Sequence, residues 1–331
     1  MMRGMKRTGL IAALLICGVL LWAQADWAVP WGEKADVSKA TASGAADAAP
    51  DAATPRTAAT GGTPLQAREL KVLTSFYPMH IMALNVFAGV PGVTIEMLAP
   101  AMTGCLHDYS LTTEAMRRLE KADLLIANGL GMESYIPMIT KKFPRLEIVQ
   151  LSRRITPIRD KHGPNPHVWV SIDKAGLQVI NLTQFLVKFD PARHAAYKEN
   201  GRAYGQQLEA LGQEMHQRLD RFKGAPIVTF HEAFPYFAEE FGLKIAAVIE
   251  REPGTAPTPR DLADTIAAIR KQKVSALFSE PQYPSTAAAI IARETGLTVH
   301  PLDPAVTGPL NADAYLAIMR KNMDVLEEAL K

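Results

Sequence analysis

Cysteine is scarce in this chain of 331 residues, which contains only Cys17 and Cys105. Cys17 lies in an apolar segment near the N-terminus that we expect to be removed. A single remaining cysteine cannot form an intramolecular disulfide, so a disulfide-stapled scaffold is excluded for the mature chain. The stability of the folded part must therefore come from a hydrophobic core.

A strong excess of either charge is also missing. The formal net charge is +2, and it becomes −1 if residues 1–25 leave with the three cations Arg3, Lys6 and Arg7. A nearly neutral chain offers no basic surface for nucleic acid or for an anionic membrane. We therefore expect no nucleic-acid partner.

Several enzyme motifs are absent from the sequence, which contains no G-x-S-x-G, no P-loop and no glycine-rich dinucleotide motif. His231-Glu232 is followed by Pro235, where an H-E-x-x-H zinc helix needs its second histidine. We expect that the chain is not an enzyme. The alternative is a secreted zinc hydrolase, because three protein ligands with an open fourth position also suit catalytic zinc.

Residues 1–25 predict a secretory signal peptide. Their cations precede an uncharged stretch from Thr8 to Trp22, and Ala23-Gln24-Ala25 supplies a cleavage site. The stretch is shorter than the roughly 20 residues of a membrane helix, although an uncleaved anchor is the alternative. We expect a periplasmic or otherwise extracytoplasmic protein.

Large apolar residues are almost missing between Trp31 and Leu65, where Ala, Thr, Pro, Gly and Asp dominate. Such a segment cannot bury enough surface to offset its chain entropy. We expect residues 26–69 to be a disordered linker.

From Leu70 onward, short β-rich runs alternate with amphipathic segments. The predicted strands are Lys71–Ser75, Val93–Leu98, Asp123–Ala127, Glu147–Gln150, Pro226–Phe230, Lys244–Ile249, Ala276–Ser279 and Thr298–Pro301. This alternation is typical of parallel sheets with crossover helices, so the predicted fold class is α/β.

Asp190-Pro191 opens a long helical pattern that continues to Gly224, with apolar residues every three to four positions. A helix of some 32 residues would be about 48 Å long. The sequence therefore predicts two lobes with parallel sheets flanked by helices, joined by one long rigid helix. We expect an N-terminal metal-binding lobe at 70–189, the connecting helix at 190–223 and a C-terminal metal-binding lobe at 224–331.

Three histidines and one aspartate stand just after predicted strands or in loops, where the site residues of parallel sheets gather. They are His107, His167, His231 and Asp303. Three imidazoles and one carboxylate are the ligand set of a four-coordinate zinc site. We predict that this set holds one ion between the two lobes, and no catalytic or cofactor-binding residues.

Three residues close in sequence to these predicted ligands have more than one possible role. Cys105 stands two residues before His107, and a thiolate is a strong zinc ligand, but four ligands already fill a tetrahedron. We therefore expect a thiol near the site that is not a ligand. Asp108 and Glu232 adjoin two of the histidines, and each could orient an imidazole or serve as a helix-capping charge.

Motifs across the folded part resemble one family, in order along the chain. They are Thr74-Ser75-Phe76-Tyr77-Pro78, His107-Asp108-Tyr109, Ala122-Asp123-Leu124, Gly131-Met132-Glu133, His167-Val168-Trp169, His231-Glu232-Ala233-Phe234, Glu280-Pro281-Gln282 and Leu302-Asp303-Pro304. The family is the metal-binding class of periplasmic solute-binding proteins of ABC importers, and its zinc-binding members are the most similar.

The resemblance implies a metal held at the lobe interface by residues matching His107, His167, His231 and Asp303, and delivery of the metal to a membrane permease by a monomer. It implies transported Zn²⁺ rather than Mn²⁺, because manganese-binding relatives tend to carry Glu at the position of His231. A manganese- or iron-binding member of the family is the alternative, and an adhesin is another. The His-rich loop of many zinc members is reduced here to 159–163, with a single histidine.

Overall fold

The computed structural model describes residues 69–106, 109–160, 163–250, 257–283 and 286–331. The predicted signal peptide and nearly all of the predicted linker lie outside these residues. His107 and Asp108 lie outside them as well, so the role predicted for His107 stays a prediction.

The first sheet has four parallel strands in the order β2–β1–β3–β4. The strands are β1 (Leu70–Thr74), β2 (Val93–Met97), β3 (Leu124–Ala127) and β4 (Glu147–Gln150). Successive residues of a strand point to opposite faces, and here both faces are covered: Val72 and Leu73 enter different apolar clusters.

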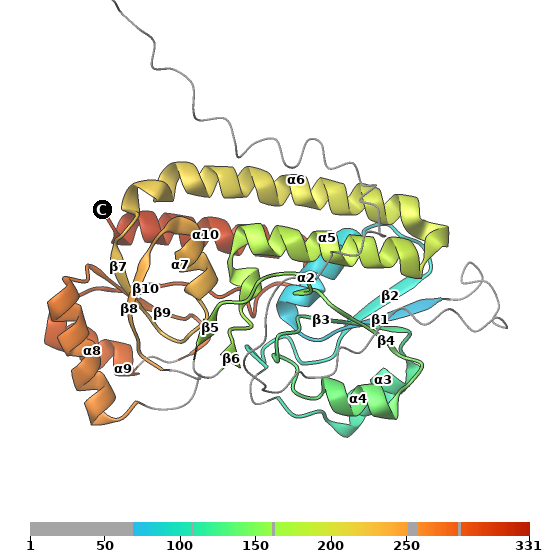
Figure 1. The fold of residues 1–331 in the computed structure, drawn as a ribbon, viewed down its shortest axis with the longest axis horizontal. Coiled ribbons are helices and arrows are strands. Elements are labelled where there is room, and N and C mark those ends of the chain that lie inside the picture. Colours follow the sequence, from blue (N-terminus) through green and yellow to red (C-terminus); the bar gives the residue numbers. More distant parts are fainter. Residues whose placement is uncertain (1–68, 107–108, 161–162, 251–256, 284–285) are drawn as a thin grey trace, which may run out of the picture. The chain divides into compact units, whose positions relative to one another are not determined.

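Three helices cover the first sheet. Helix α2 (Tyr77–Val86) lies on one face, and α3 (Thr113–Lys121) and α4 (Ile136–Lys142) lie on the other (Figure 1). Thr112 caps the N-terminus of α3, because its side chain accepts a hydrogen bond from the backbone N–H of Ala115.

The second sheet repeats this arrangement, with parallel strands in the order β10–β9–β7–β8. The strands are β7 (Pro226–Thr229), β8 (Lys244–Val248), β9 (Ala276–Ser279) and β10 (Val299–Pro301), and the helices are α7 (Pro235–Phe241), α8 (Pro259–Gln272) and α9 (Thr286–Thr295). Each predicted strand is present, and its ends differ from the prediction by no more than one residue.

In both sheets the chain first moves to one side of its starting strand and then crosses to the other side. It passes from β1 to β2 and then to β3, and from β7 to β8 and then to β9. The carboxyl ends of strands at such a switch in direction are where α/β sheets usually bind ligands. The segments after β1, β3, β7 and β9 are therefore the places to look for a site.

The predicted connecting helix is present but shorter than expected. The α-helix α6 spans His194–Leu219, and single 3-10 turns, η3 (Pro191–Arg193) and η4 (Asp220–Phe222), stand at its ends. The three helical elements together run from Pro191 to Phe222, and the sequence pattern includes both turns because apolar spacing does not distinguish one 3-10 turn from a turn of α-helix. Twenty-six residues make a helix of about 39 Å.

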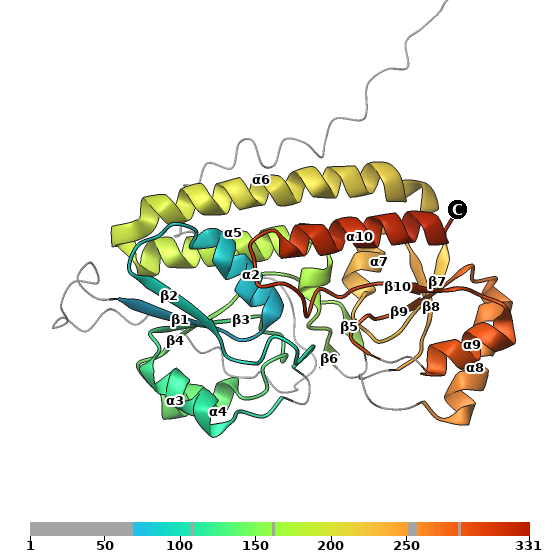
Figure 2. The same cartoon turned by 180° about the vertical axis from the view of Figure 1, so that it is seen from behind.

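Helix α6 does not stand alone. It packs against α5 (Ile172–Phe189) beside the first sheet and against α10 (Ala314–Ala329) beside the second (Figures 1 and 2). One face of each sheet joins these helices in a single apolar cluster. The two sheets and the connecting helix of the predicted fold class are thus confirmed, and a shared core holds them.

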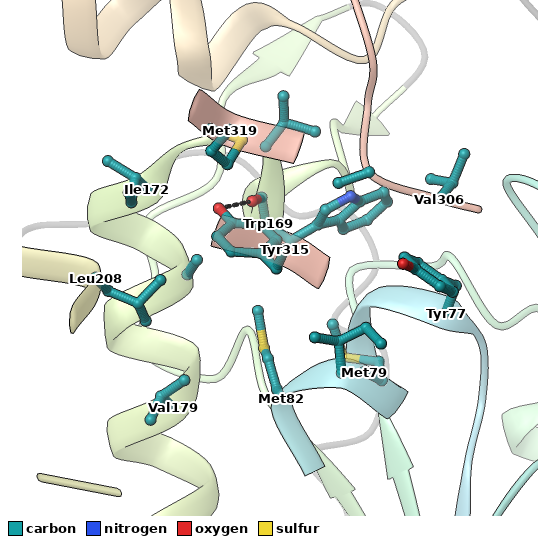
Figure 3. Packing of buried hydrophobic residues seen from close by; sticks show 14 of the residues in the cluster. Tyr77, Met79, Met82, Trp169, Ile172, Val179, Leu208, Val306, Tyr315 and Met319 are labelled. Carbon is teal, nitrogen blue, oxygen red and sulfur yellow. Dashed lines mark hydrogen bonds between the residues drawn. The ribbon is translucent and has the colours of Figure 1, made fainter. Parts of the chain in front are cut away.

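Hydrogen bonds inside this core connect segments far apart in the sequence. The Tyr315 hydroxyl donates to the carbonyl of Trp169 at 2.7 Å (Figure 3), and the Trp169 indole N–H donates to the carbonyl of Pro304 at 2.8 Å. Both rings are buried, so each polar group has its partner where water cannot serve. Trp169 lies in η2 (Val168–Val170), which follows the short ribbon of β5 (Arg159–Asp160) and β6 (Gly163–Pro164).

Among the helices in the described part of the chain, none is both long and apolar enough to span a membrane.

Two glycines of α6 provide a matched test of its packing on α5. A Cβ at position 201 would lie 2.1 Å from Oγ1 of Thr183, whereas a Cβ at position 212 would lie 3.4 Å from Ile172. We expect Gly201→Ala to lower the free energy of unfolding by about 1–2 kcal/mol, because overpacking outweighs the gain in helix propensity. Gly212→Ala is expected to raise it by up to about 1 kcal/mol. Urea unfolding curves of the two variants measure both effects, and equal midpoints would contradict the close α5–α6 contact.

Candidate metal site

His231 follows β7 at the carboxyl edge of the second sheet and is fully buried. Its Nδ1 contacts Oε1 of Glu280 closely, and the same oxygen accepts the backbone N–H of His231 at 3.4 Å. Glu280 is also buried and directly follows the neighbouring strand β9. The carboxylate therefore fixes the orientation of the imidazole.

His167 is the residue that immediately precedes η2, and it is 2% exposed. Its Nδ1 lies 3.1 Å from Oδ1 of Asn165, which also accepts the backbone N–H of His167 at 2.9 Å. The side-chain nitrogen of Asn165 also has a partner, because Nδ2 donates to the carbonyl of Glu232 at 2.8 Å. This bond identifies which end of the amide is the oxygen. Asn165 thus ties the segment of His167 to the segment that follows His231.

These contacts determine which ring nitrogen each histidine presents. An oxygen of Asn165 or Glu280 that accepts from Nδ1 requires the hydrogen of the neutral imidazole to be on Nδ1. The lone pair is then on Nε2, which is the arrangement found in most histidines that bind a metal. The ring centroids of His167 and His231 lie 5.2 Å apart, so the two imidazoles can share one ion.

A third potential ligand joins the pair. Sγ of Cys105 lies 3.7 Å from Nε2 of His231, and ligand atoms of Cys105, His167 and His231 all lie within 4.8 Å of one another. Cys105 is half-buried, in the segment between β2 and α3. The group therefore combines residues that follow strands of both sheets.

The first sheet supports this group through a buried polar network. Glu133 accepts the Ser75 hydroxyl at 2.8 Å and the backbone N–H groups of Asn128 and Gly129 at 2.7 and 2.9 Å. Burial raises the pKa of Glu133, which these hydrogen bonds partly offset. Nδ2 of Asn128 donates to the carbonyl of Pro166 at 2.9 Å, next to His167. The network thus fixes the approach of the backbone to His167.

Asp303 follows β10, as predicted, but among the described residues it is not in the close group with His167 and His231. Its Oδ1 accepts the side-chain amide of Gln282 at 2.7 Å and the backbone N–H of Ala305 at 2.9 Å. Burial raises its pKa, and the bond from Gln282 acts in the opposite direction. Its role as a ligand stays a prediction.

Sequence reasoning missed the carboxylate that contacts a histidine ring. It proposed Asp108 and Glu232, which adjoin histidines in the sequence, whereas the described contact to His231 comes from Glu280. The available signal was position, because Glu280 directly follows a predicted strand, as His231 does. Asn165 gave no comparable signal.

A second group, Asp173, His216 and Glu240, lies where α5, α6 and α7 meet. Glu240 accepts the backbone N–H of Asp173 at 3.3 Å, and Nδ1 of His216 lies 2.9 Å from Oδ1 of Asp220. Burial, and next the charge of Asp173, raise the pKa of Glu240 to about 7. A proton on Glu240 accounts for the closeness of the two carboxyl groups without a metal.

The chain is similar to a family of known proteins. Residues 72–329 match the family model described as zinc-uptake complex component A periplasmic. The high-affinity zinc uptake system protein ZnuA of Bacillus subtilis is 25% identical over 292 residues, which are 82% of this chain and 90% of that protein. The iron-binding protein YfeA of Yersinia pestis is 28% identical over 237 residues, 70% of this chain and 75% of that protein.

A solved structure adds a third metal. The solute-binding protein FpvC from Pseudomonas aeruginosa, in complex with Mn²⁺, matches with a TM-score of 0.72 and 28% identity over 80% of this chain and 98% of its own. Relatives named for zinc and iron, and a solved structure that holds Mn²⁺, are therefore all similar to this chain. Their similarity does not assign one ion to this chain.

The contact between Glu280 and His231 predicts that Glu280→Gln weakens zinc binding. The amide keeps the size of the side chain but loses the charge that makes the imidazole a better ligand, so we expect zinc affinity to fall about 10- to 100-fold. Competition with a chromogenic chelator measures it. Glu120→Gln, at an exposed residue of α3, is the control. If the zinc affinities of Glu280→Gln and the wild type differ by less than about twofold, Glu280 does not orient the His231 imidazole for zinc binding.

The raised pKa of Glu240 predicts how stability depends on pH. The folded state binds this proton more tightly than the unfolded state, so stability is lost as pH rises from the unfolded value of about 4.3 to about 7. We expect Glu240→Gln to raise the free energy of unfolding by about 2 kcal/mol at pH 8 and to change it little near pH 4. Urea titrations at both values measure this, with the exposed neighbour Glu239→Gln as control. A gain of the same size at both values would rule out the proton linkage.

Proposed function

The chain belongs to the family of periplasmic zinc-uptake components, metal-binding solute-binding proteins of ABC importers, and from this premise we propose that it captures one Zn²⁺ for delivery to a membrane permease. The ion is the transported substrate. A protein with this role binds and releases its solute without turnover, so no catalytic residue is required.

The single observation that carries the proposal is the pair of buried imidazoles, His167 and His231. Each has Nδ1 next to an oxygen acceptor, so each presents Nε2 as a ligand atom. The residues come from segments beside different sheets, so an ion between them would connect the two halves of the fold. His107 is the third imidazole of the proposed set.

The fourth position has two candidate donors in this chain. Asp303 offers a carboxylate that now accepts two hydrogen bonds, and Cys105 offers a thiol that already lies near His231. The two donors imply different selectivity, because carboxylates suit manganese as well as zinc, whereas thiolates favour zinc and other soft ions.

Zinc is the proposed ion because the donor set is rich in imidazole nitrogen. Nitrogen ligands rank zinc well above manganese and iron(II) in affinity. A manganese- or iron-binding role is the alternative within the family, since one similar protein is named for iron and one similar structure is in complex with Mn²⁺.

Release is proposed to involve local movement rather than wide opening of two halves. Helix α6 packs against α5 and α10 along its length, and the Tyr77 hydroxyl donates to the carbonyl of Pro309 at 3.0 Å across the shared core. A large rotation of the sheets would break these buried contacts. Contact with the permease is therefore expected to displace a segment that carries a ligand.

The remaining features of the proposal come from the sequence and the family. We propose a signal peptide at 1–25, a linker at 26–69, lobes at 70–189 and 224–331 around the connecting segment 190–223, and a monomer outside the cytoplasm. In this role the protein binds the metal outside the cytoplasm and then passes it to the permease. Buried side chains such as His167 and His231 can hold the ion during this transfer.

Elemental analysis of residues 26–331, purified without a histidine tag and loaded with zinc, tests the proposal. We expect about one zinc per chain, and we expect His167→Ala to lower the zinc content, because the variant removes one of the two buried imidazoles that present Nε2 to the site. His194→Ala is the control, since His194 is exposed at the start of α6. Manganese or iron retained in preference to zinc would move the protein to the alternative within the family. No bound metal after loading would refute a metal-uptake function.

A further inference from the structure

Cys105 is the feature of the site that family membership leaves unexplained. Sequence reasoning treated it as a thiol near the ligands, because His107, His167, His231 and Asp303 already make four. The described geometry differs from that expectation. The group whose ligand atoms lie within 4.8 Å of one another contains Cys105 with two of the histidines, and does not contain Asp303.

The separation between sulfur and nitrogen fits a shared ion. In a tetrahedral zinc site, a Zn–S bond of about 2.3 Å and a Zn–N bond of about 2.0 Å place the two ligand atoms about 3.5 Å apart. Sγ of Cys105 and Nε2 of His231 are 3.7 Å apart. Nε2 is also the nitrogen that the contact between Nδ1 and Glu280 leaves to act as a ligand.

The residues next to Cys105 in the sequence and in space determine its position. Gly104 has a φ of +77°, and a Cβ there would lie 2.4 Å from the hydroxyl oxygen of Tyr283. Tyr283 follows β9 in the second sheet, and its hydroxyl accepts the backbone N–H of Cys105. A glycine thus lets the segment after β2 approach the second sheet closely enough for Cys105 to reach His231.

We propose that the Cys105 thiolate is a direct ligand of the transported ion, beside His167 and His231, and that it makes this a nitrogen–sulfur site selective for soft ions such as Zn²⁺. The proposal rests on the proposed metal-uptake function and specifies its substrate class. Binding replaces the thiol proton, which leaves to solvent, by a metal–sulfur bond, and no electron is transferred.

Two features of the site favour sulfur over the carboxylate of Asp303. Oδ1 of Asp303 accepts hydrogen bonds from Gln282 and Ala305, and some of these contacts would weaken if it turned to an ion. Sγ of Cys105 already lies 3.7 Å from Nε2 of His231.

A cysteine beside a histidine that a carboxylate orients also resembles a thiol nucleophile with its base. The second imidazole argues for a metal instead. A nucleophile needs one base, whereas His167 adds a further nitrogen donor to the group and presents it from a separate segment. Three donors around one point suit an ion.

Cobalt substitution tests the proposal on residues 26–331. A thiolate ligand gives Co²⁺ an intense charge-transfer band in the near ultraviolet, which imidazole and carboxylate ligands do not give. We expect this band in the wild type and its loss in Cys105→Ser, together with a fall in zinc affinity of at least about 100-fold, more than the loss of an orienting residue causes. Met102→Ser is the matched control, because it removes an exposed sulfur from the same segment.

A second measurement needs no variant. Cys105 is the only cysteine in residues 26–331, so the rate of its reaction with a disulfide reagent reports on this thiol alone. We expect one equivalent of zinc to suppress the reaction.

The outcomes separate this proposal from the proposed function. One bound cobalt per chain without the charge-transfer band, together with a reaction rate that zinc leaves unchanged, would overturn the sulfur ligand while metal uptake stands. Absence of bound cobalt and zinc would overturn the metal-uptake function itself, and the ligand with it. Loss of metal in Asp303→Asn but not in Cys105→Ser would return the fourth position to the carboxylate.

Discussion

Apolar packing of one face of each sheet against the same three helices determines where the two sheets meet. Ile227 of β7 and Val72 of β1 belong to one cluster that also contains buried residues of α5, α6 and α10. Because both sheets are parallel and use the same strand order, this packing brings segments beyond their carboxyl ends together. The site is a consequence of that contact.

The polar groups at the site depend on the same packing. The oxygen of Glu280 reaches His231 because β9 pairs with β7, and Asn165 reaches Glu232 because the turn before η2 lies against the second sheet. A histidine whose Nδ1–H is held by an acceptor is a better and more selective ligand than a free one. The fold therefore orients both imidazoles in advance, which would reduce the ordering cost of binding the proposed ion.

Proteins similar to this chain include relatives named for zinc and iron and a solved structure in complex with Mn²⁺, so the family fold by itself does not fix the metal, and the donors are where selectivity can arise. A single exchange of carboxylate for thiolate would change the softness of the site without altering either sheet. For the metal site proposed in this chain, the difference would depend on whether Cys105 or Asp303 supplies the fourth ligand. Because Gly104 has no side chain, its segment can lie close to Tyr283, and Cys105 can therefore reach His231.

Local patterns in the sequence were sufficient for the strands, their parallel alternation, and the positions of His167 and His231 after or between elements, because each depends on neighbours a few residues away. They did not reveal the 3-10 turns around α6, or that α5 and α10 support it. The close contacts of His231 with Glu280, 49 residues away, and with Cys105, 126 residues away, were decided only by the tertiary structure. Contacts at such separations depend on how two sheets pack on shared helices, and no periodicity along the chain encodes that packing.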